Sequence, residues 1–213
     1  MAAPEPYPLQ LEAGLPLKCP AFALAALRVQ ASAPALRGEI AKLGDELRAK
    51  WRDVNIGEIS GIAPVRACYR ALGIDPTKTR PSSEALLRRV LKGQELYTVN
   101  TLVDALNLCS LRFLVPFGLY DLDKVKPPVE LRRGREGEGY AGIRKDRVNV
   151  AGRPCLADME GPFGNPTSDS ERTSIALATT RALVVPFLPI ETDAARTDEI
   201  VRETARVLAM YSA

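Results

Sequence analysis

Residues 99–123 read VNTLVDALNLCSLRFLVPFGLYDLD. The first part of this stretch is mostly apolar and predicts a helix from about Val99 to Leu114, with Thr98 as its N-cap. From Val115 onward the pattern changes to short apolar segments bounded by Gly, Pro and Asp, which is typical of strands. The stretch therefore marks the boundary between a helical first half and a strand-rich second half.

The predicted helix carries polar residues at positions i, i+4 and i+7, namely Asn100, Asp104 and Asn107. This spacing places them on one narrow stripe of the helix surface. Because a buried polar group without a partner is destabilising, the stripe must meet solvent, bond neighbouring backbone or line a pocket. The sequence leaves a pocket and a structural network open, and in a pocket these three residues are the candidate catalytic groups.

The segment PFGLYDLD follows, from Pro116 to Asp123. A proline and a glycine beside an aromatic residue suggest close approach of the backbone to another group, so Pro116, Gly118 and Tyr120 are candidate substrate contacts. Asp121 and Asp123 can cap a turn, accept hydrogen bonds or bind a hard cation. Asp121 joins the candidate substrate contacts, but two aspartates alone do not make a metal site, and we expect no metal.

Upstream, three segments have the apolar spacing of helices. They are Ala35 to Trp51, a segment opened by Pro64 and ended by Gly73, and SSEALLRRVLKG, which Ser82 or Ser83 can cap and Gly93 can end in a left-handed conformation. The apolar stretch from Leu15 to Val29 suits a short strand pair.

Downstream, the segments VELRR, RVNV, CLADM and ALVVPFL are predicted strands, and a helix is predicted from Asp193 to Met210. Helices that precede strands, rather than alternate with them, indicate the α+β class. No repeat or linker divides the chain, so we expect one domain over residues 1–213. Residues 1–14 would form a Pro-rich leader, and residues 193–213 a C-terminal helix.

Composition excludes several functions. The 213 residues include no histidine, which rules out His-dependent triads and His-ligated zinc, and no common nucleotide-binding or protease motif is present. The four cysteines form no CxxC pair and are expected to be buried and reduced. No apolar run approaches a membrane span, and no secretory signal opens the sequence, so the expected location is the cytoplasm.

Positive charge is concentrated in one segment. The chain has 29 Lys and Arg against 26 Asp and Glu, a net charge of +3. The segment from Arg66 to Lys92 contains seven basic residues and only two acidic ones, Asp75 and Glu84, which is a local excess of five positive charges. This segment is either a solvated surface or a binding site for phosphate or carboxylate, for which Arg80 and Arg88 are the candidates, together with Glu84.

The loop EGPFGNPTSDSERT, residues 160–173, lies between two predicted strands. It is a simple turn or a cradle whose backbone N–H groups and hydroxyls bind substrate or an oxyanion. In the second case its candidate substrate contacts are Gly161, Gly164, Asn165 and Ser168.

The order of these elements resembles a known family. The run VNTLVDALNLCSLRFLVPFGLYDLDKVKPPVELRRGREGE is similar to the Asn-x-x-Val-Asp-x-x-Asn … Pro-x-His-x-x-Asp-x-Asp segment of the B3/B4 domain in the phenylalanyl-tRNA synthetase beta subunit. RPSSEALLRRVLKGQEL and the glycine-rich loop are similar to free-standing versions of the domain. The resemblance covers about Ala63 to Val185, and DEIVRETARVL resembles the next helix. It implies a three-layer arrangement of two β-sheets with helices.

In the synthetase, the pocket of this domain hydrolyses tyrosine mistakenly attached to phenylalanine tRNA. The resemblance implies that Asn107 is the pocket asparagine and Pro116 a wall of the pocket. The family's histidine is replaced by Gly118 and its threonine by Leu106, and its acidic loop residue is replaced near Asn165 or Pro166. These departures concern the chemistry, whereas the residues that match at Val103, Asp104, Asp121 and Asp123 concern the fold.

Three hypotheses follow. The first is a free-standing domain that binds tRNA and hydrolyses mischarged aminoacyl-tRNA in trans, without a cofactor and without aminoacylating tRNA itself. The second is a non-catalytic module that kept the fold and binds an amino acid, a small metabolite or RNA. The third is a protein-interaction domain in which the polar stripe is only structural.

Overall fold

The computed structural model describes residues 4–144 and 146–212. Its helices are α1 (Pro34–Trp51), α2 (Ala63–Ala71), α3 (Ser82–Leu91), α4 (Thr101–Phe113) and α5 (Ala194–Ser212), with short 3-10 turns at Ile56–Glu58 and Leu122–Lys124. Its strands are β1 (Glu5–Pro6), β2 (Leu9–Leu11), β3 (Leu17–Lys18), β4 (Phe22–Leu24), β5 (Phe117–Asp121), β6 (Val129–Arg133), β7 (Gly139–Ala141), β8 (Arg147–Asn149), β9 (Pro154–Asp158), β10 (Gly161–Gly164), β11 (Ala182–Pro186) and β12 (Leu188–Pro189).

Two four-stranded sheets form the frame. The first sheet has the strand order β1-β4-β11-β5, and the second has the order β10-β9-β6-β2. β2 runs parallel to β6, and the other pairings in these two sheets are antiparallel. The small pairs β12-β3 and β7-β8 complete the described strands.

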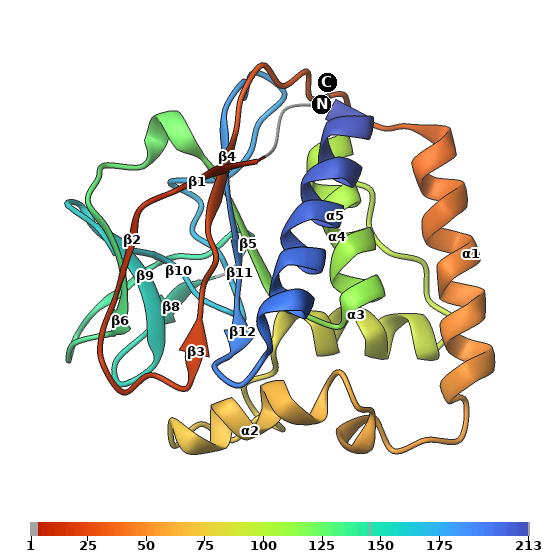
Figure 1. Ribbon diagram of the computed structural model, residues 1–213, viewed down its shortest axis with the longest axis horizontal. Helices are drawn as coiled ribbons and strands as arrows, with labels where there is room; N and C mark the ends of the chain where they lie inside the picture. Colours follow the sequence, from red (N-terminus) through yellow and green to blue (C-terminus); the bar gives the residue numbers. More distant parts are fainter. Residues whose placement is uncertain (1–3, 145, 213) are drawn as a thin grey trace.

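The first sheet is the middle layer of three (Figure 1). On β11, Ala182 and Val184 pack against the helices, whereas Leu183 and Val185 face the second sheet, and all four are fully buried. Because successive side chains of a strand point to opposite faces, a strand buried on both sides must lie between two layers. Helices, first sheet and second sheet are therefore stacked in that order, which confirms the α+β class and the three-layer arrangement.

Several local predictions are confirmed. The four helical segments outside α4 and the four downstream strands are present within a few residues of the predicted bounds. Gly73 and Gly93 follow α2 and α3 with φ of +73° and +70°, which is the left-handed conformation expected where a helix ends. The cap of α3 is different: Pro81 occupies the N-cap position and neither Ser82 nor Ser83 provides a side-chain cap.

The N-terminal segments differ from expectation. β3 and β4 do not pair with each other, because β3 pairs with β12 and β4 pairs with β1 and β11. In the region expected as a leader, β1 and β2 add an edge strand to each main sheet. Within the described ranges, no helix has both the length and the apolar character needed to span a membrane.

The four cysteines are free and buried, as predicted. Burial raises the pKa of the Cys68 thiol to about 11 and those of Cys109 and Cys155 to about 12, and it also raises the pKa of Cys19. Since the thiolate is the reactive form, we expect almost no reaction with a thiol reagent at pH 8 in the native protein and reaction of all four thiols in denaturant. Rapid native labelling, followed by absorbance, would contradict this.

Candidate functional site

A large open pocket of about 860 Å³ lies between α3, α4, β5 and the loop after β10. Its walls are largely apolar and include Leu86, Val103, Leu106, Phe117, Leu119 and Ile175. Its cationic lining residues are Arg80, Arg88, Arg89, Lys92 and Arg144, whereas Asp169 is the one acidic side chain among the described lining residues. An apolar interior with a cationic rim suits a ligand that has an apolar part and a negative charge.

The polar residues on the stripe of α4 have two different roles: Asn100 and Asp104 bond the backbone, whereas Asn107 lines the pocket. Asn100 is the N-cap, and its side chain accepts a hydrogen bond of 3.0 Å from the Val103 N–H. Asp104 accepts one of 3.0 Å from the Val99 N–H, and both side chains are buried. The predicted cap at Thr98 is therefore wrong, because Asn100 reaches the free N–H groups of the first turn, and neither Asn100 nor Asp104 lines the pocket.

Asn107 behaves differently, because it is partly exposed and lines the pocket. Among the residues that the structure describes, none hydrogen bonds to its side-chain amide. A donor and an acceptor are thus available to a ligand from the middle of α4.

Asn100 and Asn107 allow a matched comparison of two asparagines on one helix. Replacing Asn100 with alanine removes the cap and is expected to lower the free energy of unfolding by about 1 kcal/mol. Replacing Asn107 should change it by less than about 0.5 kcal/mol, because no bond within the chain is lost. Urea unfolding measures both, and equal effects would contradict the division of the stripe.

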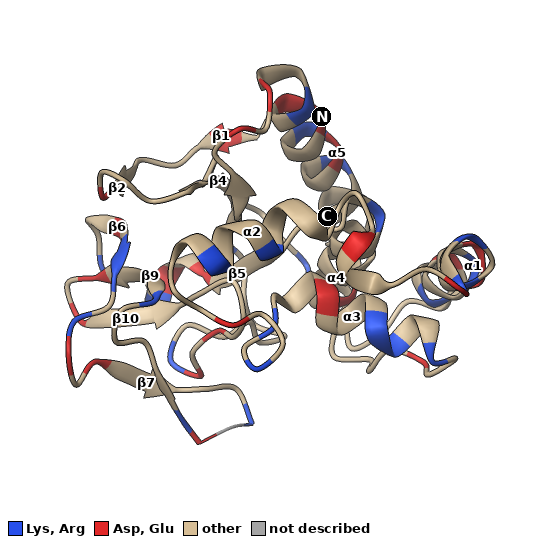
Figure 2. Ribbon diagram, turned by 90° about the horizontal axis from the view of Figure 1, so that it is seen from below, with Lys and Arg blue, Asp and Glu red and all other residues tan. Residues whose placement is uncertain are grey.

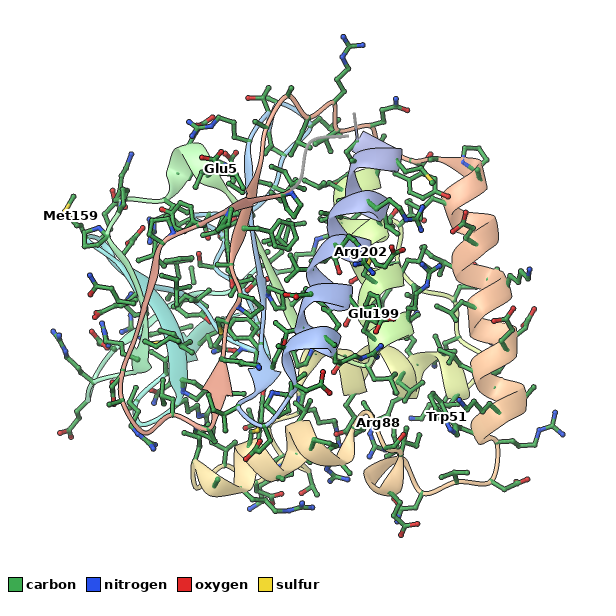
Figure 3. All side chains as sticks on the ribbon, in the orientation of Figure 1. Glu5, Trp51, Arg88, Met159, Glu199 and Arg202 are labelled. Carbon is green, nitrogen blue, oxygen red and sulfur yellow. The ribbon has the colours of Figure 1, made fainter. Side chains whose placement is uncertain are left out.

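Arg88 is held in the pocket by a buried carboxylate. Glu84 is fully buried on α3, and its Oε1 accepts a hydrogen bond of 2.8 Å from Arg88 Nε. Its Oε2 lies 3.6 Å from Nε of the buried Arg66. Glu84 itself does not line the pocket, so it is a positioning residue rather than the substrate contact that the sequence suggested. Figure 3 labels Arg88, and Figure 2 shows the basic positions of α2 and α3.

Strand β5 presents alternate residues to the pocket and to the space between the sheets. Phe117 and Leu119 line the pocket, whereas Tyr120 belongs to the core between the sheets. A Cβ atom on Gly118 would lie 2.2 Å from Tyr120 Oη, so Gly118 shares the face that Tyr120 fills. The predicted contacts Gly118 and Tyr120 are therefore corrected, because they are on the opposite face of the strand.

The two residues that flank this part of β5 are structural as well. Pro116 is buried and its carbonyl accepts a hydrogen bond from Phe187 N–H. Asp121 is buried and accepts hydrogen bonds from the Asp123 N–H at 3.2 Å and the Thr179 hydroxyl at 2.8 Å. Neither lines the pocket. Among the described residues, no group of three or more Cys, Asp or Glu side chains is placed to hold a metal ion.

The loop after β10 is fixed from inside the protein by three tyrosine hydroxyls. Tyr69 bonds to the Thr167 hydroxyl at 2.7 Å, Tyr120 donates to Asp169 Oδ1 at 2.6 Å, and Tyr140 donates to the Ser168 carbonyl at 2.5 Å. Burial, followed by the negative charge of Asp169, raises the pKa of Tyr120, so this tyrosine stays a donor. The loop is thus a rigid wall of the pocket.

The loop residues that line the pocket differ from those that the sequence suggested. Asn165 accepts hydrogen bonds from the N–H groups of Thr167 and Ser168 at 2.8 and 2.9 Å, which closes a turn. Thr167 and Asp169 line the pocket instead. The predicted contacts that do not line it are Gly161, Gly164, Asn165 and Ser168.

Of the residues predicted from the sequence, Arg80, Arg88 and Asn107 line the pocket together. Sequence reasoning missed Asp169, Arg144 and Tyr97, which also line it. Asp169 had one available signal, because it is the only acidic residue between Glu160 and Glu171. Arg144 and Tyr97 lie in connecting segments, and the sequence pattern of these segments gives no signal for a binding residue.

Comparison with known proteins gives one family and two curated relatives. The family model of the B3/4 domain matches residues 65–210. The phenylalanine–tRNA ligase beta subunit of Bartonella quintana (strain Toulouse) is 34% identical over 91 residues, which are 42% of this chain and 11% of the relative. That of Bartonella henselae (strain ATCC 49882 / DSM 28221 / CCUG 30454 / Houston 1) is 30% identical over 105 residues, 48% of this chain and 13% of the relative.

Among solved structures, an N-terminal fragment of the phenylalanyl-tRNA synthetase beta subunit from Pyrococcus horikoshii matches with a TM-score of 0.43 and 19% identity. The match covers 52% of this chain and 40% of the fragment. The chain thus spans only 11% and 13% of the length of the two curated relatives. Because the family model covers more than half of the residues, the chain belongs to the B3/4 domain family.

Proposed function

We propose that this B3/4 domain binds the acylated end of a tRNA in the cytoplasm and hydrolyses mischarged aminoacyl-tRNA in trans. The observation that carries the proposal is the pocket, in which the free amide of Asn107 faces apolar walls and a rim of arginines and lysine. An aminoacyl-tRNA end has the matching parts, namely an amino acid side chain, an ester and phosphates. The resemblance to the beta subunit of a tRNA ligase supports this choice of substrate.

The residues of the pocket divide the work by their chemistry. Arg80 and Arg88 pair with phosphate oxygens, and Glu84 keeps Arg88 oriented. The Asn107 amide donates to the ester carbonyl and stabilises the oxyanion that forms when water attacks. Asp169, which accepts a hydrogen bond from Tyr120, holds the α-ammonium group of the amino acid.

The reaction is a simple ester hydrolysis. Water adds to the acyl carbon, the bond from that carbon to the ribose oxygen breaks, and the ribose oxygen leaves with a proton as the hydroxyl. The chain has no histidine to act as the base. Since general acid–base help is worth about 10²–10⁴ in rate, we expect slow turnover assisted by the neighbouring ribose hydroxyl.

One observation favours the alternative, a module that binds an amino acid, a small metabolite or RNA without hydrolysis. The resemblance places a histidine at position 118, where this chain has glycine, and the ring of Tyr120 fills the adjacent space. Position 118 therefore supplies no base in this chain, and the buried Tyr120 beside it donates a hydrogen bond to Asp169. Such a site keeps its binding residues without a base.

The test is release of labelled amino acid from a panel of correctly charged and mischarged tRNAs. We expect release from at least one mischarged tRNA, a loss of tenfold or more in Asn107→Ala and Arg88→Ala, and no change in Lys42→Ala, an exposed cation on α1 outside the pocket. Absence of release across the panel would reject hydrolysis. Thermal stabilisation by tRNA or an amino acid without release would then support the binding module.

A further inference from the structure

Tyr97 is an exposed aromatic side chain that is held in one position at the pocket. It is 69% exposed in the connection between α3 and α4, and it lines the pocket. The guanidinium carbon of Arg89 lies 4.0 Å from the centre of its ring, and Arg89 Nη1 lies 3.2 Å from its hydroxyl oxygen. Arg89 is itself fixed by a hydrogen bond of 2.5 Å from its Nε to the Glu95 carbonyl.

This arrangement leaves much of an aromatic ring open to solvent while one face is braced by a cation. An exposed aromatic side chain is unfavourable in water and loses conformational entropy when it is fixed. The ring contributes nothing to the core, since it belongs to no buried cluster. A fixed and exposed ring is, however, a surface on which a planar group can stack.

The surroundings of Tyr97 specify the charge of that planar group. Arg80, Arg88, Lys92 and Arg144 line the same pocket as Tyr97 and Arg89, against the single acid Asp169 among the described lining residues. A nucleic acid strand offers planar bases along a chain of phosphates, and proteins bind single strands by combining aromatic stacking with cationic contacts. In a duplex the internal bases are stacked on both faces and only the terminal pairs have an open face, so an unpaired strand fits the ring better.

We propose that Tyr97, braced by Arg89, stacks against an unpaired base of the RNA whose 3′ end enters the pocket, while the surrounding cations bind its phosphates. This inference rests on the proposed function for the identity of the strand. It adds a sequence-tolerant stacking site beside the reacting ester, because every base has a face that can stack.

The experiment measures binding without any acyl group, so that it does not depend on hydrolysis. A fluorescently labelled single-stranded RNA of six nucleotides ending in adenosine is titrated with the full chain at low salt, and anisotropy gives Kd. A blunt duplex of the same sequence is titrated in parallel. Stacking of one base is worth about one order of magnitude or more in affinity, so Tyr97→Ala should raise Kd for the single strand about tenfold.

Two variants separate stacking from other effects. Tyr97→Phe keeps the ring and should bind within about twofold of the wild type, and Lys42→Ala on α1 should do the same. The duplex should bind more weakly, and its Kd should not respond to Tyr97→Ala. Equal binding by wild type and Tyr97→Ala, equal binding of single strand and duplex, or no binding of the single strand would each overturn the stacking site.

Failure of the stacking site and failure of the proposed function give different results. Tyr97-dependent RNA binding in a protein that releases no amino acid from any charged tRNA would reject the hydrolase and keep the stacking site. Hydrolysis that is unaffected by Tyr97→Ala, together with unchanged RNA binding, would keep the hydrolase and reject the stacking site. Because the Tyr97 side chain is exposed, the thermal unfolding of Tyr97→Ala serves as the check that the variant is folded.

Discussion

Replacing Glu84 with alanine is expected to lower the free energy of unfolding by about 3–5 kcal/mol. Glu84 is fully buried, and the guanidinium of the buried Arg66 lies beside it. The Nε atom of Arg66 has no hydrogen-bond partner, so this arginine depends on the charge of Glu84. Without the carboxylate the buried guanidinium loses its ion-pair partner, and its positive charge remains in the interior.

The effect is measured by urea unfolding of Glu84→Ala, with Glu46→Ala on the exposed side of α1 as the control. The control should change stability by less than about 0.5 kcal/mol. The double variant Glu84→Leu with Arg66→Met removes both charges and should recover most of the loss, because an apolar pair can replace a buried ion pair. A loss below about 1 kcal/mol in Glu84→Ala would show that the interior does not depend on this pair.

The same substitution tests the orientation of Arg88. Its Nε donates to Glu84 Oε1, and its side chain is 38% exposed, so it stays solvated when the carboxylate is lost. Arg88 therefore adds little to the stability effect, but it loses the bond that directs it into the pocket.

Helix positions were predictable, because apolar spacing and terminal residues within the segment itself determine them. The apolar spacing of SSEALLRRVLKG gave α3, and Gly93 ends it because a glycine adopts positive φ without strain. The start of α4 was misplaced by two residues, because Thr98 and Asn100 are both good caps and only the geometry decides between them.

Strand partners were not predictable, because they depend on distant segments. β4 pairs with β11, which lies near the other end of the chain, and nothing in residues 22–24 indicates this. The apolar pattern from Leu15 to Val29 indicates strands correctly but contains no information on register or partner.

The pocket shows where sequence reasoning about a site ends. Residue type and helical spacing singled out Arg80, Arg88 and Asn107, and all three line the pocket. The side of β5 that lines the pocket was not predictable, since FGLYD is buried at every position and no exposed side marks its orientation. Because the orientation of β5 was unknown, the sequence did not predict that Phe117 and Leu119 line the pocket.

Substitution of Gly118 is the second change with a large expected effect. The family resemblance suggests that a histidine at this position would increase hydrolysis, and we expect the contrary. Restoring a histidine at this position is expected to destabilise the protein by about 3 kcal/mol, at the upper end of overpacking, and not to increase hydrolysis. A Cβ atom there would lie 2.2 Å from the hydroxyl of the fully buried Tyr120. Movement of the ring is restricted, because Gly164 also packs against the Tyr120 hydroxyl: a Cβ atom on Gly164 would lie 2.1 Å from Tyr120 Oη.

The single Cβ atom can be tested separately, with a glycine in open space as its control. Gly118→Ala should lower the free energy of unfolding by about 1–3 kcal/mol, since the core must shift to accept one methyl group. Gly38→Ala in α1, where nothing lies within 4 Å of the new Cβ, should raise it by about 0.5–1 kcal/mol through the higher helix propensity of alanine. Urea unfolding of the two variants gives the comparison.

Stability of Gly118→Ala equal to or above that of the wild type would contradict the packing of Tyr120 against position 118. If Gly118→Ala lowers the free energy of unfolding and Gly38→Ala raises it, the glycine at 118 is required for the packing of Tyr120. A larger residue at 118 displaces the ring, and the displaced ring no longer donates to Asp169, the one acidic side chain among the described residues that line the pocket. Position 118 therefore acts on the pocket through the core between the sheets, and a histidine placed there would disturb Asp169 without reaching a bound ester.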